Sequence, residues 1–281
     1  MTESTTTASR PAAGAGVGRA IFEAEGIIKR FGGIRAVNGA SMAIREGSIT
    51  ALIGPNGAGK TTFFNLITGF YRPDAGTATF DGRSIEGKAS YKIARLGMVR
   101  TFQITKALAR MSVLDNMMLA APEQPGERLI NVLFRPASSR RREAEVREQA
   151  MELLEVFDLA KLADGYAGTL SGGQRKLLEL ARALMTQPRL LLLDEPMAGI
   201  NPTLGKRLLE HMERLRTDQG VTFLFVEHDM EVVMNHSDRV IVMAEGRVIA
   251  EGDPETVRSD QAVIDAYLGG AKLPGERGGS G

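Results

Sequence analysis

The 281-residue chain contains no cysteine. This absence excludes disulfide bonds, zinc–thiolate sites and thiol nucleophiles together, and it is compatible with a reducing cytoplasm. Long apolar runs are also missing: no uninterrupted stretch approaches the ~18 to 20 residues needed to cross a bilayer, so we do not expect the chain to span a membrane by itself. The net charge is small. With 35 basic and 34 acidic residues it is +1. The chain as a whole therefore has no strong positive electrostatic field that would attract nucleic acid or anionic lipid.

Hydrophobic residues make up 43% of the chain, enough to bury a sizeable core in one large or two modest domains. Residues 1–19 are rich in Thr, Ser, Ala and Gly and lack the apolar segment of a secretory signal, and we expect a disordered leader there. Residues 269–281 are rich in glycine, and we expect a flexible tail. The predicted folded domain covers 20–268.

Strands are predicted where polar and apolar residues alternate, or where short apolar runs end in turn signals. We expect strands at 21–25, 49–53, 77–80, 190–193 and 221–226, and a hairpin formed by 239–243 and 247–250. The uniformly apolar run 190–193 is typical of a central parallel strand that is buried on both faces.

Helical periodicity dominates from about 106 to 185, and a further helix is expected at 203–216. The clearest apolar stripe consists of Val146, Ala150, Leu153, Leu154 and Phe157. The charges between Arg140 and Glu148 alternate in sign, which favours a solvated helix face over a nucleic-acid patch.

A P-loop pattern lies between an apolar run and an apolar helical stretch, a context that predicts a nucleotide site rather than an ordinary glycine-rich turn. Its residues are Gly54, Pro55, Asn56, Gly57, Ala58, Gly59, Lys60, Thr61 and Thr62. The glycines let backbone N–H groups turn toward phosphate oxygens, and the helix that starts near Gly59 adds the positive end of its dipole. Lys60 is expected to reach the β and γ phosphates, and Thr61 to place its hydroxyl on Mg²⁺.

Two carboxylates, Asp194 and Glu195, follow the apolar run 190–193, and ligands bind at such strand ends in parallel α/β sheets. We expect Asp194 to orient Mg²⁺ or its water shell and Glu195 to take a proton from the attacking water. Adjacent strand residues point to opposite sides of a sheet, so Asp194 can face the metal and Glu195 the water only if the chain turns there. We assign this turn to Pro196. An acidic strand end that caps the next helix is the alternative.

A second glycine-containing helix start comprises Ser171, Gly172, Gly173 and Gln174, directly after Leu170. Ser171 can cap the helix while the two glycines expose N–H groups to an anion, which would make a second phosphate site, although an ordinary N-cap has the same pattern. Together with the P-loop and the two carboxylates, this stretch resembles the signature sequence of ATP-binding cassette (ABC) ATPases.

The resemblance covers nearly all of residues 21–252 and implies an α/β fold. The fold has a RecA-like core, an N-terminal antiparallel β subdomain and an α-helical subdomain inserted at about 104–186. It implies that Phe31 stacks on adenine, that Gln103 contacts Mg²⁺ and water, and that His228 senses the γ-phosphate. We assign His211 and His236 to surface or structural positions.

In this family, the signature of one subunit closes over the ATP that the P-loop of another subunit holds. This chain has one of each, so the resemblance implies a homodimer or a pair with a related subunit. A short helix of a permease docks between core and helical subdomain in the family, and we place that contact at 104–108. The expected location is the cytoplasmic face of the plasma membrane, with peripheral attachment through two permease subunits.

One departure from the family pattern is Asn201, which stands where many cassettes have an interfacial Asp. A resemblance to the ATPase subunits of branched-chain amino-acid importers is carried by four stretches together. They are the Ala-Gly-hydrophobic-Asn-Pro sequence around Asn201 and residues 226–230, 249–254 and 266–269. That likeness implies an extracytoplasmic solute-binding protein as an indirect partner, and no nucleic acid. The alternatives are the ATPase of a lipopolysaccharide or lipid exporter, that of a urea or amide importer, and a soluble ABC ATPase without a transport role.

Overall fold

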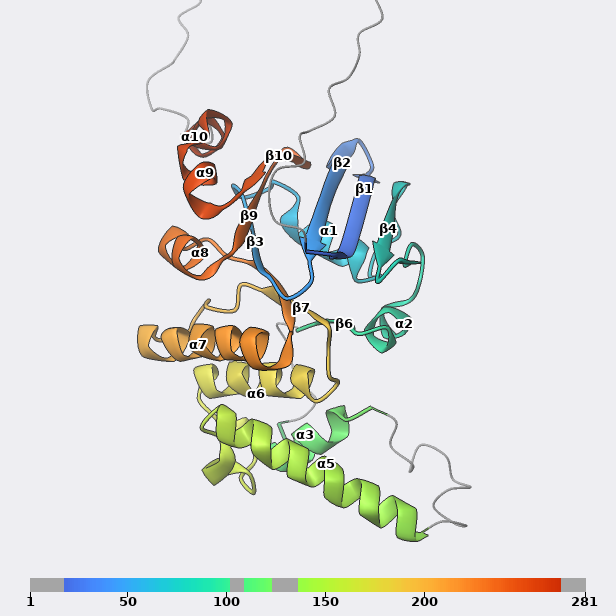
Figure 1. Cartoon of the computed structure of the whole chain (residues 1–281), viewed down its shortest axis with the longest axis vertical. Helices are drawn as coiled ribbons and strands as arrows, with labels where there is room; N and C mark the ends of the chain where they lie inside the picture. The colour runs from blue at the N-terminus through green and yellow to red at the C-terminus, as the bar shows by residue number, and fades with distance from the viewer. Residues whose placement is uncertain (1–17, 102–108, 123–135, 269–281) are drawn as a thin grey trace, which may run out of the picture.

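The computed structural model describes residues 18–101, 109–122 and 136–268, and within these ranges the chain forms two sheets with helices around and below them (Figure 1). The N-terminal sheet contains β1 (Ala20–Phe31), β2 (Ile34–Arg45), β4 (Ala75–Phe80) and β5 (Arg83–Ser84). The second sheet contains β3 (Ile49–Ile53), β6 (Met98–Arg100), β7 (Leu190–Asp194), β8 (Thr222–Val226), β9 (Arg239–Ala244) and β10 (Arg247–Gly252).

The N-terminal sheet is antiparallel, in the order β2-β1-β4-β5. The prediction of a five-residue strand at 21–25 was wrong in length, because β1 has 12 residues. The alternation breaks at Gly26, which has a φ of +59°, and the register with β2 shifts between Ala24 and Ile27. Such a β-bulge absorbs the irregular residues and lets the strand continue.

The second sheet has the order β10-β9-β3-β8-β7-β6, in which all neighbours are parallel except the β9–β10 hairpin. The predicted hairpin is confirmed. Its two loop residues, Glu245 and Gly246, both have positive φ, as a tight two-residue turn requires. The predicted apolar strands at 190–193 and 221–226 are confirmed as β7 and β8, whose apolar residues are buried because helices or the other sheet cover both faces.

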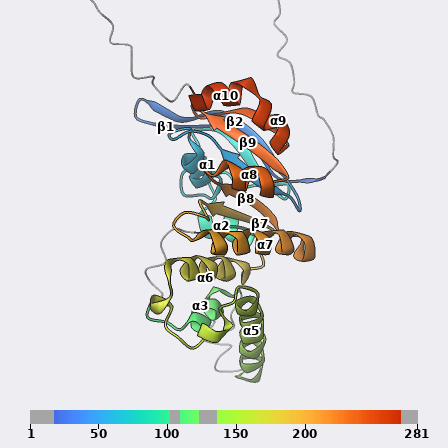
Figure 2. The same cartoon turned by 90° about the vertical axis from the view of Figure 1, so that its left-hand side faces the viewer.

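The helices that build the lower half of the molecule are α3 (Val113–Ala120), α5 (Pro136–Val156), α6 (Gly172–Leu184) and α7 (Pro202–Gln219), with short 3₁₀ turns at Ala160–Leu162 and Ala167–Thr169. Both cartoon views place α6 and α7 beneath the second sheet and α3 and α5 farther out (Figures 1 and 2). The remaining helices, around the sheets, are α1 (Lys60–Ile67), α2 (Ser90–Arg95), α8 (Met230–His236), α9 (Pro254–Ser259) and α10 (Gln261–Leu268).

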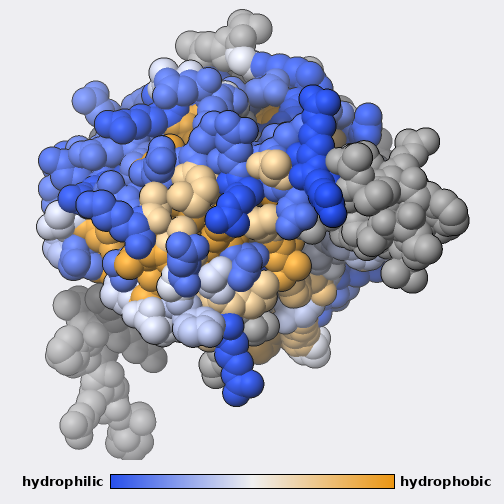
Figure 3. All heavy atoms as spheres, turned by 90° about the horizontal axis from the view of Figure 1, so that it is seen from below, coloured by the Kyte–Doolittle hydropathy of each residue, from blue (hydrophilic) through white to orange (hydrophobic). Residues whose placement is uncertain are grey.

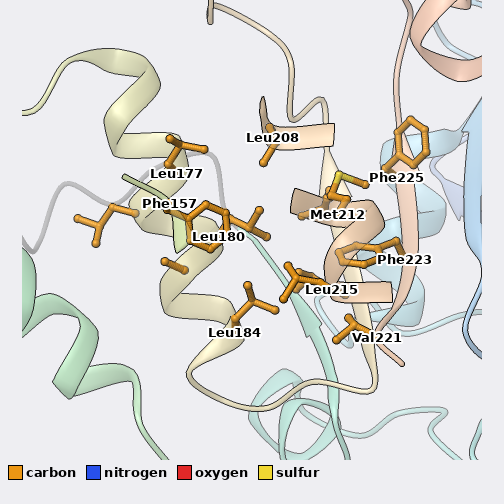
Figure 4. Close-up of a cluster of buried hydrophobic side chains, with 14 of the residues drawn as sticks. Phe157, Leu177, Leu180, Leu184, Leu208, Met212, Leu215, Val221, Phe223 and Phe225 are labelled. Atoms are coloured by element: carbon orange, nitrogen blue, oxygen red, sulfur yellow. The ribbon is translucent and has the colours of Figure 1, made fainter. Parts of the chain in front are cut away.

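The helices of the lower half and one face of the second sheet share an apolar core. Leu177, Leu180 and Leu184 of α6 lie toward α7, which in turn packs on Phe223 and Phe225 of β8 (Figure 4). The predicted stripe from Val146 to Phe157 is buried in the same cluster, while Arg140 to Glu145 of α5 are largely exposed, as predicted. Helix α6 is therefore joined to the second sheet by continuous packing through α7.

The face of the helical half seen from below is largely hydrophilic, with apolar side chains gathered near its middle (Figure 3). Exposed large apolar residues of this half include Leu119, Val156 and Tyr166. Among the residues that the structure describes, no helix is both long and apolar enough to cross a bilayer. The segments 1–17 and 269–281, which hold most of the expected leader and the tail, lie outside these residues.

Candidate nucleotide site

The P-loop joins β3 to α1, and two of its glycines are required by close backbone approaches. Gly54 has a φ of +146° and Gly59 a φ of +98°, both in the region that side chains avoid. A Cβ on Gly54 would collide with the carbonyl oxygen of Met243, and one on Gly59 with that of Ala36. The loop is thus pressed against the β9 strand end and against β2, which fixes the position of the first turn of α1.

The N-terminus of α1 has no side-chain cap. Gly59 is its N-cap residue and supplies no side chain, whereas Ser, Asn or Asp side chains accept backbone N–H bonds at the starts of α3, α6, α7, α8 and α9. The first N–H groups of a helix need partners from outside it, and an anion satisfies them well. The residues of this loop therefore fit a nucleotide phosphate group.

Lys60 is the first residue of α1, and its side chain is buried within the loop. Its Nζ donates to the carbonyl oxygens of Gly54 at 2.6 Å and Pro55 at 3.0 Å. Burial lowers the pKa of this ammonium, against which the negative charges of Glu195 and Asp194 raise it. The structure thus brings the P-loop lysine into the electrostatic range of both predicted acidic residues.

Asp194 ends β7 and forms a nearly buried ion pair that the sequence analysis missed. Its Oδ2 accepts from Arg100 Nη2 at 2.7 Å, and the two side chains are 9% and 10% exposed. Arg100 also donates to Asn65 Oδ1 of α1 at 2.6 Å and lies over the Phe64 ring. The sequence analysis predicted no strand at 98–100, so the position of Arg100 beside β7 could be recognised only from the β6–β7 pairing.

Glu195 and His228 meet across the ends of β7 and β8. Glu195 Oε1 lies 2.7 Å from His228 Nε2, with the two side chains 33% and 47% exposed. Glu195 has a φ of +49°, and its N–H donates to Val226 O at 3.0 Å. The turn that separates the two carboxylates therefore begins at Glu195 itself, one residue before Pro196, to which the sequence analysis assigned it.

The predicted adenine-stacking residue, Phe31, lies at the end of β1 and is 44% exposed. Its ring meets Tyr71 edge to face with 5.3 Å between ring centroids, and Lys29 Nζ lies 5.7 Å from its centroid. These contacts hold the ring at the surface rather than in the core. Gln103 and the predicted permease contact at 104–108 lie outside the described residues.

The signature stretch begins α6 with a closed capping box. Ser171 Oγ accepts from the Gln174 N–H at 3.2 Å, and Gln174 Oε1 accepts from the Ser171 N–H at 2.9 Å. The predicted Ser171 cap is confirmed. The two glycines differ: Gly172 faces open space, while a Cβ on Gly173 would collide with Leu204 of α7. The absent side chain of Gly173 thus leaves room for the end of the Leu204 side chain.

Asn201, the departure from the family pattern, is the N-cap of α7, and its Oδ1 accepts from the Leu204 N–H at 2.9 Å. His211 and His236 have structural surroundings, as predicted. The His211 ring packs against Phe157 with 4.8 Å between centroids, and His236 Nδ1 lies 2.8 Å from Glu213 Oε1.

An uncapped glycine-rich loop before α1, a buried lysine and a strand-end carboxylate pair at one edge of a parallel sheet define a P-loop nucleotide-binding protein of the α/β class. The comparisons with known proteins narrow this class. The family model described as "ABC transporter" matches residues 37–198, more than half of the chain. A second model, described as "Branched-chain amino acid ATP-binding cassette transporter", matches residues 247–272. The chain belongs to the ABC transporter family, as an ATP-binding and ATP-hydrolysing subunit.

Individual proteins agree with this assignment. The chain is 44% identical to the high-affinity branched-chain amino acid transport ATP-binding protein BraF of Pseudomonas aeruginosa, over 90% of this chain and 99% of the relative. An ATP-binding cassette solved in its ADP conformation superposes with a TM-score of 0.77 at 40% identity, covering 89% of this chain and 99% of that chain. A dimeric cassette bound to ADP and phosphate gives a TM-score of 0.68 at 26% identity, covering 83% and 98%. The predicted fold class is confirmed.

Proposed function

We propose that this chain powers the import of branched-chain or other hydrophobic amino acids through separate permease subunits. The observation that carries this solute class is the match of residues 247–272 to the branched-chain cassette model, outside the part that all ABC ATPases share. The 44% identity to BraF over nearly the full length of both proteins supports it. Export of a lipid, or import of urea or an amide, stays the alternative.

Each cassette would hold ATP with the loop before α1. The uncapped N–H groups of its first turn face the phosphates, and Lys60 exchanges its bonds to Gly54 and Pro55 for phosphate oxygens. Thr61, Gln103 and Asp194 would supply the oxygen ligands that suit Mg²⁺, and the ion would neutralise phosphate charge. Arg100 already balances the Asp194 charge and keeps that carboxylate at the sheet edge.

Hydrolysis would use the pair at the ends of β7 and β8. Glu195 accepts a proton from the attacking water, and His228, 2.7 Å from Glu195 Oε1, holds that carboxylate in place and contacts the γ-phosphate. The side chain of Glu195 pairs with His228, whereas that of Asp194 pairs with Arg100. The two carboxylates can therefore act separately, one on the metal and one on water.

Two cassettes would work together, in a homodimer or with a related subunit. Phe31 stacks on the adenine of its own ATP, while Ser171, Gly172, Gly173 and Gln174 approach the ATP of the partner cassette. The dimeric solved relative supports this arrangement. The assembly would lie at the cytoplasmic face of the membrane, attached through two permeases, and a solute-binding protein would deliver the amino acid.

The function can be tested by uptake of radiolabelled leucine into cells that lack this gene and carry either the unchanged chain or Glu195→Gln. We expect uptake to be restored only by the unchanged chain. Uptake of a charged amino acid serves as the control for membrane energisation. Equal leucine uptake in all strains would contradict the proposed solute class.

The partners can be identified by affinity purification of tagged Glu195→Gln from detergent-solubilised native membranes with Mg·ATP, followed by mass spectrometry. Two importer-type permeases would support the proposal. Permeases of a lipid-extraction system would favour the export alternative, and soluble partners alone would rule out transport.

A further inference from the structure

Lys176, one turn into the signature helix α6, reaches the loop that carries Glu195. Its Nζ donates to the carbonyl oxygens of Glu195 at 3.1 Å and Pro196 at 3.3 Å, and also to that of Ala198. An ammonium group has three donors and no acceptor, so these three carbonyls match its full hydrogen-bonding capacity. Burial lowers the pKa of this amine, while Glu227, Glu179 and Glu195 raise it.

The other side of the same loop is held by Glu227, a buried carboxylate at 5% exposure. Its Oε1 accepts from the Met197 N–H at 2.7 Å, and its Oε2 accepts from the His228 N–H at 3.2 Å. Burial raises the pKa of Glu227, and the two backbone bonds lower it. Lys176 thus donates hydrogen bonds to three carbonyl groups of the loop, and Glu227 accepts one from its Met197 N–H. Glu227 also connects that loop to His228.

A second contact joins α6 to the segment after this loop. The missing side chain of Gly173 makes room for Leu204, in the first turn of α7. The apolar faces of α6 and α7 continue this packing over their length (Figure 4). The signature helix therefore touches the loop and the helix that follow Glu195 at several points within one chain.

We propose that Lys176 is a positioning residue that ties the orientation of Glu195 to the signature helix of its own chain. The inference rests on the proposed function, in which that helix approaches the ATP of the partner cassette. A displacement of α6 by the partner's nucleotide then shifts the backbone that carries Glu195 and its contact with His228. Each cassette becomes competent for hydrolysis only when its signature is engaged, which couples the two ATP sites.

The test compares Lys176→Met, Lys176→Gln and Lys176→Arg in the assembled transporter, purified through a tag on this chain. Methionine keeps the length of the side chain but donates no hydrogen bond, glutamine can donate to only part of the carbonyl set, and arginine keeps the cationic donors. We expect kcat for ATP to fall between about tenfold and 10²-fold in Lys176→Met, as for other misplaced catalytic groups. The kcat of Lys176→Gln should lie between that of Lys176→Met and that of the unchanged chain, and Lys176→Arg should recover most of the activity.

Two readouts separate positioning from a merely structural role. ATP affinity should stay within about twofold of that of the chain with Lys176, and so should ATP-driven dimerisation in a Glu195→Gln background. The reason is that losing an interaction needed only in the transition state lowers kcat and spares ground-state binding. Lys206→Met, the same substitution at an exposed position on α7, is the matched control and should match the unchanged chain.

Unchanged kcat in Lys176→Met would overturn the inference, and so would a parallel loss of ATP affinity, dimerisation and thermal stability. Failure of Glu195→Gln itself to dimerise with ATP would instead overturn the proposed function, and the inference with it.

Discussion

The two helix ends that the sequence assigns to phosphate binding are built differently. At α1 the N-cap is Gly59 and no side chain closes the first turn, whereas at α6 Ser171 and Gln174 bond each other's backbone and close it. The first end leaves the N–H groups of its first turn open to an anion. At the second end, the Ser171 and Gln174 N–H groups find their partners within the chain, so the helix start is fixed without a ligand.

The difference extends to the surroundings of each end. Lys60 turns back onto the loop before α1 and is buried there. The Gly172 end of α6 faces open space, while Gly173 and Lys176 attach the helix to the loop after β7. The α1 end therefore suits the proposed role of holding the phosphates, and the α6 end suits the proposed role of coupling the partner's nucleotide to Glu195.

The largest predicted effect lies between the two ends, at Glu195. Glu195→Gln should lower kcat for ATP by about 10²- to 10⁴-fold, the range for loss of a general base, while ATP affinity is retained. Steady-state hydrolysis and equilibrium nucleotide binding measure the two quantities. Near-normal turnover would move the base role to another group.

Next in size is the loss of the lysine at the α1 end. Lys60→Ala should weaken ATP binding by about 10- to 100-fold, because a charge-assisted hydrogen bond contributes about 1.5 to 3 kcal/mol. Thermal unfolding should be measured beside it, because the substitution also removes the Lys60 hydrogen bonds to Gly54 and Pro55. Lys161→Ala, at a 3₁₀ turn in the helical half, is the control, and an unaltered ATP affinity in Lys60→Ala would contradict the assignment.

The glycine pair at the α6 end provides a matched comparison. Gly173→Ala should destabilise the fold by about 1 to 2 kcal/mol, because the end of the Leu204 side chain must shift, whereas Gly172→Ala should leave stability unchanged or slightly raised. Thermal unfolding of both variants measures the difference. Equal stabilities would show that Gly173 is not needed for packing.

The smallest effect is expected at the cap itself. Ser171→Ala should cost about 1 kcal/mol of stability, because the Gln174 N–H loses its partner. For a chain of this size the midpoint of thermal unfolding should fall by about 2 to 4 °C. Ser171→Asp should restore it, since Asp is an equally good cap; no recovery would indicate that the capping box contributes little.

The motifs that sequence analysis identified are local ones. A P-loop, a capping box and a strand-end acidic pair each occupy a few consecutive residues, so their spacing alone indicates their geometry. The fold class came from the family resemblance that these motifs carry, and apolar runs such as 190–193 indicated the buried parallel strands.

The missed features depend on contacts between distant segments. Arg100 reaches Asp194 only because β6 and β7 pair in parallel, and Lys176 reaches the Glu195 loop only because α6 packs on α7. The left-handed conformation of Glu195 is equally invisible in the sequence, since glutamate rarely adopts it. In β1, the bulge at Gly26 extended a strand that alternation alone would have ended.

The central claim is that the α1 end of one chain and the α6 end of another form one ATP site. The most direct test mixes two variants in a Glu195→Gln background: Lys60→Ala, which breaks the α1 end, and Gly172→Asp, which places a carboxylate at the open α6 end. Each alone should fail to form an ATP-dependent dimer, and the mixture should form one that traps a single ATP, measured by analytical ultracentrifugation and nucleotide quantification. A mixture as inert as either variant alone would contradict the account.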